Sequence, residues 1–239
     1  MTYVDAADLR VISGGGAQSV LQRLAPQFET TTGSKVQLEF AVVGAIQQKL
    51  TAGEKPDVLL LPAPLLDTIE RASAFRARSR VLIGRIGIGI VVREGASVPD
   101  VSTVDAVRTT LLHARSVVFP SPKLTPSGAH VLRVFEQIGI AREVQPKITF
   151  RNAIDGGVNL VRDGEIELGF FLVTEILPAT GVTFVGTLPA ALQSYVVYVA
   201  ALSGDSTEID TASQFVEFIS GARQREAWNA AGFEPVDGK

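Results

Sequence analysis

Short apolar runs and amphipathic segments alternate along the first third of the chain. Between residues 17 and 29 the apolar side chains recur at the spacing of one helix face, whereas residues 35–40 alternate as in a half-buried strand. The expected strands in this part are 9–13, 35–40 and 57–61, and the expected helices are 17–29, 44–52 and 65–74. This order of strand and helix predicts a parallel sheet with helices on its faces.

The rest of the chain repeats the theme of strand, loop and helix. The expected strands are 86–92, 116–119, 147–150, 168–173 and 195–201, and the expected helices are 103–112, 129–138, 158–163 and 211–230. The last helix carries the only tryptophan, Trp228, and has no sheet of its own. Its apolar face is expected to pack back on the first sheet.

That return of the C-terminal helix predicts two lobes, one of them discontinuous. Lobe 1 is expected to comprise residues 1–84 and 196–239, with residues 85–195 inserted as lobe 2. The crossovers are placed near 82–92 and 188–198.

Composition excludes several kinds of protein. The 239 residues include no cysteine, which excludes disulfides, thiolate metal sites and cysteine nucleophiles. The net charge of −3 has mixed signs along the chain, so no nucleic-acid partner is expected. The longest apolar run, 86–92, is too short to span a bilayer, and we expect no membrane insertion. Residues 1–10 do not read as a leader, so the location is cytoplasmic if Met1 is the native start and periplasmic if a leader was removed.

Four loops share one signature, in which a strand ends, a turn rich in small residues follows, and a helix begins. They are 14–19, 41–44, 121–128 and 152–157. A helix start presents unpaired N–H groups and a partial positive charge, so it accepts anions. Two such loops in each lobe favour a shared anion-binding cleft. The candidate ligand-binding residues in these loops are Gly15, Gly16, Ala17, Val43, Gly44, Ser121, Thr125, Ser127, Gly128, Asp155 and Gly156.

The triple glycine at 14–16 does not fit the nucleotide-binding motifs well. A phosphate-binding P-loop needs a lysine that closes the loop, and none follows Gly16. A dinucleotide fingerprint needs glycine where Ser19 stands, although Glu39 lies near the position expected to bind ribose. Neither Gly-x-Ser-x-Gly nor a Ser/His/Asp order supports a hydrolase.

Charged and polar residues outside the helix starts add further candidates. Arg85, at the first crossover, is able to pair with a ligand carboxylate or with a carboxylate of the protein itself. Thr174 follows an apolar strand and is a candidate ligand contact. If the protein is an enzyme, Glu175 is the first candidate base, with His130 and Lys123 after it. The spacing of the two histidines predicts no metal site, and we expect no cofactor.

Several motifs together resemble a known family over nearly the whole chain. They are Phe-Glu-Thr-Thr-Thr-Gly at 28–33, Ala-Gly-Glu-Lys-Pro-Asp-Val at 52–58, the loop 122–128 and Gly-Glu-Ile-Glu-Leu-Gly at 164–169. The chain is similar to the molybdate-binding-protein-like branch of the type 2 periplasmic binding proteins. This resemblance implies an α/β, two-lobed fold, in which each lobe is a mixed, mainly parallel sheet flanked by helices and the ligand lies in the cleft between.

Departures from the family pattern fall in the ligand loops. Where molybdate binders place serines and a tyrosine, this chain has Gly16, Gly44 and about Leu172. We therefore expect a small organic anion, a di- or tricarboxylate in preference to molybdate. The resemblance implies a substrate-binding protein that delivers its ligand to an ABC permease if it is exported. The alternative is a cofactor-free isomerase of the aconitate isomerase type, which shares this scaffold.

Overall fold

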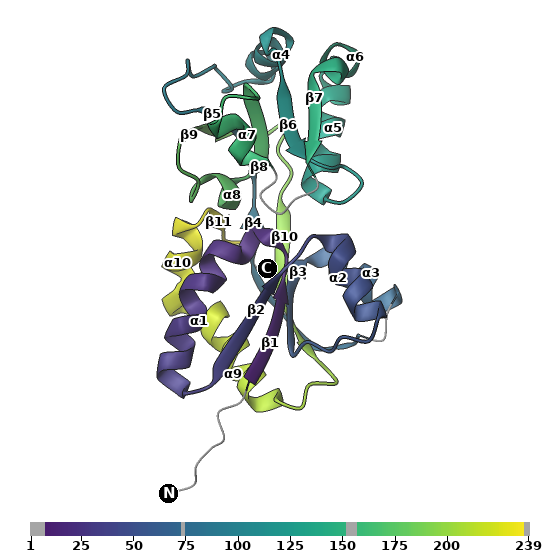
Figure 1. Cartoon of the computed structure of the whole chain (residues 1–239), viewed down its shortest axis with the longest axis vertical. Coiled ribbons are helices and arrows are strands. Elements are labelled where there is room, and N and C mark those ends of the chain that lie inside the picture. The colour runs from purple at the N-terminus through teal and green to yellow at the C-terminus, as the bar shows by residue number, and fades with distance from the viewer. Residues whose placement is uncertain (1–7, 73–74, 152–156, 237–239) are drawn as a thin grey trace, which may run out of the picture. The chain divides into compact units, whose positions relative to one another are not determined.

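The chain divides into two compact units. The structure, a computed structural model, describes residues 8–72, 75–151 and 157–236. Unit 1 comprises Met1–Arg85 and Val197–Lys239, and unit 2 comprises Ile86–Val196. The chain therefore leaves unit 1 once, after Arg85, and returns to it at Val197 (Figure 1).

Unit 1 is built on a six-stranded mixed sheet. Its strands, in spatial order, are β11 (Phe233–Glu234), β4 (Ala77–Ile86), β10 (Val196–Ser203), β3 (Val58–Pro62), β1 (Asp8–Ser13) and β2 (Lys35–Phe40). β1 pairs in parallel with both β2 and β3, whereas β10 runs antiparallel to β3. All five residues of β3 are buried, which explains why this strand reads as a continuous apolar run.

Helices cover both faces of this sheet. They are α1 (Gln18–Thr32), α2 (Val43–Thr51), α3 (Ala63–Ala72), α9 (Ile209–Ser220) and α10 (Arg225–Ala230), with short 3₁₀ turns η1 (Gly15–Ala17) and η3 (Ala222–Gln224). Figure 1 shows α1, α9 and α10 on one side of the sheet and α2 and α3 on the other. The ring of Phe28 in α1 lies 5.2 Å from Phe215 and 5.6 Å from Phe218 in α9, centroid to centroid. Segments more than 180 residues apart thus share one core.

The returning strand β10 lies inside unit 1. Ala200 and Ala201 are fully buried between β4 and β3.

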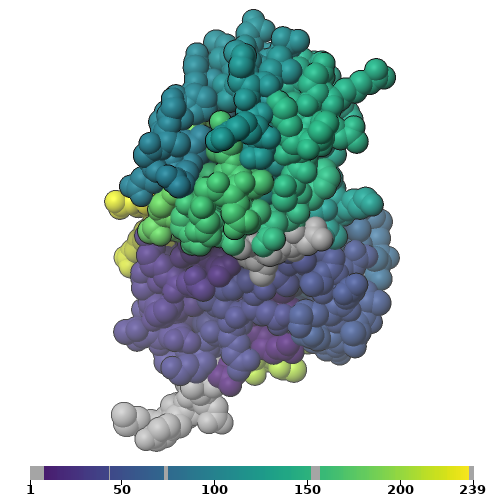
Figure 2. Space-filling view, turned by 45° about the horizontal axis from the view of Figure 1, so that its top comes forward, coloured from purple at the N-terminus to yellow at the C-terminus, as the bar shows by residue number. Residues whose placement is uncertain are grey.

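In the space-filling view, the N-terminal part of the chain, purple to blue, makes up most of the visible surface of unit 1 (Figure 2).

Unit 2 is built on a five-stranded mixed sheet. Its strands, in spatial order, are β7 (Ile148–Arg151), β6 (Val117–Pro120), β8 (Leu168–Leu172), β5 (Ile88–Arg93) and β9 (Val182–Thr187). β6 is parallel to β7 and β8, and β5 is antiparallel to β8 and β9. The helices are α4 (Val104–His113), α5 (Pro126–Gln137), α6 (Ala141–Val144), α7 (Val158–Arg162) and α8 (Val173–Ile176), with η2 (Gln145–Lys147).

Each face of the unit 2 sheet has its own core. On one face Phe135 of α5 contacts Phe119 and Phe170 edge to face, with ring centroids 5.7 and 5.8 Å apart. On the other face Val118 and Phe171 pack with residues of α7 and α8. Neighbouring residues Phe170 and Phe171 point to opposite faces, as the pleat of a strand requires.

The mixed α/β, two-sheet prediction is confirmed, but some elements were not predicted. The strands expected at 9–13, 35–40 and 57–61 are present within one residue, and Gly33 ends α1 in the left-handed conformation. The pattern missed β4, β9 and β11. The single helix expected at 211–230 was wrong, because the chain is extended at Gly221 and separates α9 from α10.

Candidate ligand-binding site

Three parallel strands of unit 1 bring their following loops to one edge of the sheet. β1, β2 and β3 run in the same direction, so Ser13, Phe40 and Pro62 end at the same edge. The Ser13 hydroxyl lies 3.1 Å from the Leu60 carbonyl oxygen and 3.0 Å from the Gly14 carbonyl oxygen. The Gly14 N–H also donates to Leu60, at 3.1 Å. The glycine loop is therefore fastened to the neighbouring strand and not free to swing.

Two of the helices that begin at this edge, α1 and α2, have apolar N-cap residues. Ala17 occupies the N-cap of α1, and Val42 occupies the N-cap of α2. Neither side chain contains an acceptor for the backbone N–H groups of the first turn, which serine, threonine or aspartate would supply. Val43 and the predicted Gly44 lie in the first turn of α2. Both helix starts thus carry a partial positive charge that no side chain of the cap offsets.

Unit 2 has a corresponding edge. β6 is parallel to β7 and β8, so Pro120, Arg151 and Leu172 end on the same side of that sheet. The Ser121 N–H donates to the Arg151 carbonyl oxygen at 2.8 Å, which holds the loop after β6 against the end of β7. The predicted Asp155 and Gly156 lie outside the described residues.

Three predicted ligand contacts in the loop 121–128, namely Ser121, Thr125 and Gly128, help to hold the loop and helix α5 in place. Thr125 caps α5, because its Oγ1 accepts from the Gly128 N–H at 3.1 Å. The same hydroxyl donates to the Ser121 carbonyl oxygen at 3.1 Å. A Cβ on Gly128 would lie 2.0 Å from the Pro120 carbonyl oxygen, so only glycine allows this approach of helix to strand. Ser121 and Ser127 are both buried.

The three candidate catalytic residues differ in their hydrogen bonding and exposure. The Glu175 carboxylate accepts from the Leu172 N–H at 3.2 Å at the start of α8. His130 Nε2 lies 2.7 Å from the Leu192 carbonyl oxygen, and because a carbonyl only accepts, this nitrogen donates. Lys123 is exposed on its loop.

Arg85 pairs with a carboxylate of the protein. Its Nη2 and Nε lie 3.0 and 3.1 Å from Glu234 Oε2, within unit 1. Glu234 belongs to the short strand β11, so this pair ties the C-terminal strand to the end of β4.

Thr174 and Arg151 have unusual surroundings at the unit 2 edge. Thr174 is 3% exposed, and among the described residues nothing hydrogen-bonds its hydroxyl. Arg151 ends β7, and its Nε is likewise buried without a partner in that part of the chain. Arg151 was not predicted, although a basic residue directly before the loop 152–157 was a visible signal.

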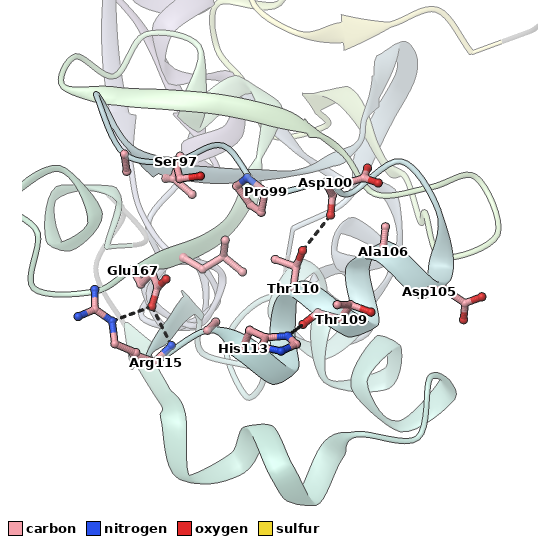
Figure 3. A pocket seen from close by; sticks show the side chains of 14 residues that line it. Ser97, Pro99, Asp100, Asp105, Ala106, Thr109, Thr110, His113, Arg115 and Glu167 are labelled. Atoms are coloured by element: carbon pink, nitrogen blue, oxygen red, sulfur yellow. Dashed lines mark hydrogen bonds and ion pairs between the residues drawn. The ribbon is translucent and has the colours of Figure 1, made fainter.

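A separate pocket of about 760 Å³ lies at the opposite end of the unit 2 sheet, where β6 and β8 begin. Figure 3 shows Arg115 beside Glu167, Thr110 beside Asp100 and His113 beside Thr109. Arg115 Nε lies 3.1 Å from Glu167, and the Thr110 hydroxyl donates to the Asp100 carbonyl oxygen at 2.8 Å. The His113 ring nitrogen Nδ1 lies 2.8 Å from the Thr109 carbonyl oxygen.

The charge of this pocket does not suit an anion. Asp100, Asp105 and Glu167 line it, against one arginine. The backbone N–H of Ser102 holds the pKa of Asp100 below its ordinary value, so that carboxyl stays charged at neutral pH. This pocket is therefore a less suitable anion site than the sheet edges at the carboxyl ends of the parallel strands.

The described residues contain neither a metal-binding cluster nor a membrane-spanning helix. No group of three or more histidine or acidic side chains within the described ranges is arranged to hold a metal ion. Among the helices of those same ranges, none combines the length and apolar character needed to cross a membrane.

Comparison with protein families identifies the class of protein. The model of the bacterial extracellular solute-binding proteins matches residues 9–234. The chain belongs to this family.

Two curated relatives and two solved structures are similar over nearly the whole chain. Aconitate isomerase from Pseudomonas sp is 29% identical over 95% of this chain and 88% of the relative. The molybdate-binding protein ModA from Escherichia coli strain K12 is 24% identical over 96% and 90%.

Among solved structures, the periplasmic molybdate-binding protein of Azotobacter vinelandii has a TM-score of 0.79 at 20% identity, covering 96% of this chain and all of that one. PEB3 with bound L-phospholactate has a TM-score of 0.74 at 14% identity, covering 96% of this chain and all of that one. These likenesses confirm the fold of a periplasmic substrate-binding protein.

Proposed function

We propose that this chain binds a small organic carboxylate, in preference to a tetrahedral oxyanion, at the sheet edges where the parallel strands end. The chain acts as the substrate-binding protein of an ABC-type transporter. The helix starts at the carboxyl ends of the parallel strands supply the positive potential.

The observation that carries this proposal is the apolar capping of the helix starts in unit 1. Val42 leaves the first-turn N–H groups of α2 without a capping side chain. Ala17 offers no capping side chain to α1 either, although the Gln18 N–H donates to the Gly15 carbonyl oxygen within η1. Such N–H groups bind an anion directly, and the dipole of each helix adds to the attraction. The absence of serine hydroxyls at these caps disfavours a small oxyanion that needs many short hydrogen bonds.

One relative supports the choice of a carboxylate, because aconitate isomerase takes its name from a carboxylate substrate. PEB3 was solved with L-phospholactate, which carries a phosphate as well as a carboxylate and so supports an organic anion. The molybdate-binding relatives support an anion in general, at lower sequence identity.

A thermal-shift panel tests the ligand class. The full chain is heated with cis-aconitate, trans-aconitate, tricarballylate, succinate, molybdate or sulfate. A ligand present at 100 times its Kd adds about 2.7 kcal/mol to the free energy of unfolding, which raises the midpoint by several degrees. We expect shifts with carboxylates. A shift with molybdate and none with any carboxylate would show that the proposal is wrong.

The family also bears on location and partner. Its members are described as extracellular solute-binding proteins, which supports action outside the cytoplasmic membrane together with a permease. Fractionation of cells that express the complete reading frame, followed by detection in the periplasmic or secreted fraction, tests this location.

A second candidate is a cofactor-free aconitate isomerase, favoured by the 29% identity to that enzyme over 95% of the chain. In this reaction a base removes a proton from the CH₂ carbon beside a carboxylate, the double bond shifts, and the proton is returned to the far alkene carbon. Glu175 is the first candidate for the base, with His130 and Lys123 after it. Helix-start N–H groups would stabilise the charge that develops on the carboxylate.

Proton NMR of cis- or trans-aconitate incubated with the protein separates the two candidates. An isomerase interconverts the two acids and incorporates deuterium from D₂O, and Glu175→Gln abolishes both effects. Binding without interconversion leaves the transport function as the better account.

A further inference from the structure

Unit 2 contains three buried polar atoms that nothing in the described part of the chain satisfies. They are Arg151 Nε, Asn159 Oδ1 and Thr174 Oγ1. A buried polar atom without a partner is costly, and folded proteins contain few of them. Arg151 Nε and Thr174 Oγ1 are able to donate, so these two atoms indicate that an acceptor from outside the described residues completes their hydrogen bonds, whereas Asn159 Oδ1 only accepts.

The three atoms belong to the same edge of the unit 2 sheet. Arg151 is the last residue of β7, and Thr174 lies two residues beyond the end of β8, which runs the same way. Asn159 is the second residue of α7. Each of the three follows or adjoins a turn at the carboxyl edge.

They also belong to the same face of that sheet. A Cβ on Gly157 would lie 2.6 Å from Arg151 Cγ and 3.0 Å from Val118 Cγ2, so the arginine side chain runs beside Val118. Val118 shares a core cluster with residues of α7 and with Ile176 of α8. The helices that carry Asn159 and Thr174 thus pack on the face along which Arg151 runs.

We propose that Arg151 and Thr174 anchor a carboxylate of the ligand at this corner of unit 2. The inference rests on the proposed function, and it assigns the carboxylate to two side chains of a single unit. The guanidinium offers Nε–H and Nη–H in one plane, which matches the two oxygens of a carboxylate. The Thr174 hydroxyl donates a further hydrogen bond, and Asn159 makes the surroundings polar.

A lysine at position 151 keeps the charge but loses the planar pair of donors. A hydrogen bond to a charged group contributes about 1.5–3 kcal/mol, which corresponds to a factor of about 10 to 100 in affinity. Isothermal titration calorimetry of the full-length Arg151→Lys variant with cis-aconitate, tricarballylate and succinate is expected to show a loss of about this size. Arg133→Lys, at an exposed position of α5, is the matched control and should bind like the wild type.

Thr174→Val provides a readout that a purely structural threonine would not give. Valine has nearly the same shape and removes the unsatisfied hydroxyl, so the unliganded protein should unfold at a higher temperature. The same substitution should weaken carboxylate binding by a factor of about 10 to 100, since a hydrogen bond to a charged group is lost. Thr109→Val, at an exposed position of α4, is its control and should change neither quantity.

The outcomes separate this inference from the proposed function. If the wild type binds carboxylates and both variants bind them equally well, the pair is not the anchor, although the proposed function stands. If only one variant loses affinity, that residue alone binds the carboxylate, and the proposal that the two residues act together is wrong. If the wild type binds no carboxylate, both proposals fall.

Discussion

At the scale of single residues, backbone geometry explains several of the small residues in the predicted ligand loops. Gly14, Gly128 and Gly157 each lie where a Cβ would approach a neighbouring atom to 3.1 Å or less. At Gly14 the neighbour is the Tyr198 hydroxyl, the end of a side chain. At Gly128 it is the Pro120 backbone carbonyl, which has far less freedom to move.

Gly128→Ala is therefore expected to lower the free energy of unfolding by about 3 kcal/mol or more, because helix α5 must shift away from β6. Chemical denaturation followed by circular dichroism measures the change. Gly204→Ala, on an exposed turn, is the milder comparison, since its Cβ would lie 3.3 Å from the Arg76 carbonyl oxygen, which needs to give by only a few tenths of an ångström. Equal stabilities for the two variants would contradict the steric argument.

At the scale of elements, Asp57 joins three segments of unit 1. Its Oδ2 accepts from the Arg10 N–H of β1 at 2.8 Å, and its Oδ1 accepts from the Ser206 hydroxyl at 2.6 Å. Its own carbonyl accepts from the Ser203 N–H at the end of β10. This buried aspartate thus holds the returning part of the chain to the N-terminal sheet.

Asp57→Ala is expected to cost about 3 kcal/mol, because it leaves a buried hydroxyl and a backbone N–H without their acceptor. Urea unfolding followed by the fluorescence of Trp228, the only tryptophan, reports on unit 1. Asp205→Ala, exposed on the adjacent turn, should change the midpoint little. A comparable loss in both variants would argue against the role given to Asp57.

At the scale of the whole molecule, unit 2 is formed by one continuous segment of the chain, whereas unit 1 is formed by two separate segments. Unit 2 is continuous from Ile86 to Val196 and has cores on both faces of its sheet. Unit 1 needs β10 in the middle of its sheet and α9 against α1. The N-terminal part of unit 1 is therefore incomplete without residues 197–239.

Excised residues 86–196 are expected to fold alone, whereas residues 1–85 are not, because β3 and β4 would lose the strand between them. A fusion of 1–85 to 197–239 through a short linker should recover the fold. Heteronuclear NMR spectra of the three fragments check this: dispersed amide signals are expected for the first and the third. A well-dispersed spectrum of 1–85 would refute the reasoning.

Much of the fold followed from local patterns. The period of apolar residues predicted the helix that became α1, and the continuous apolar run at 57–61 predicted the buried strand β3. β4 was not predicted because it carries three arginines and is exposed over much of its length. The break at Gly221 was missed because the apolar period continues on both sides of it.

The sequence by itself determined the two-sheet α/β class and the positions of the loops at which helices begin, because turn chemistry and apolar periodicity are local properties. Only the tertiary structure decided what individual side chains do there. Thr125 is a cap, Arg85 pairs with a glutamate 149 residues away, and the Nε of Arg151 is buried without a partner among the described residues. Burial and hydrogen bonding depend on which distant segments pack together, and no spacing along the chain records that.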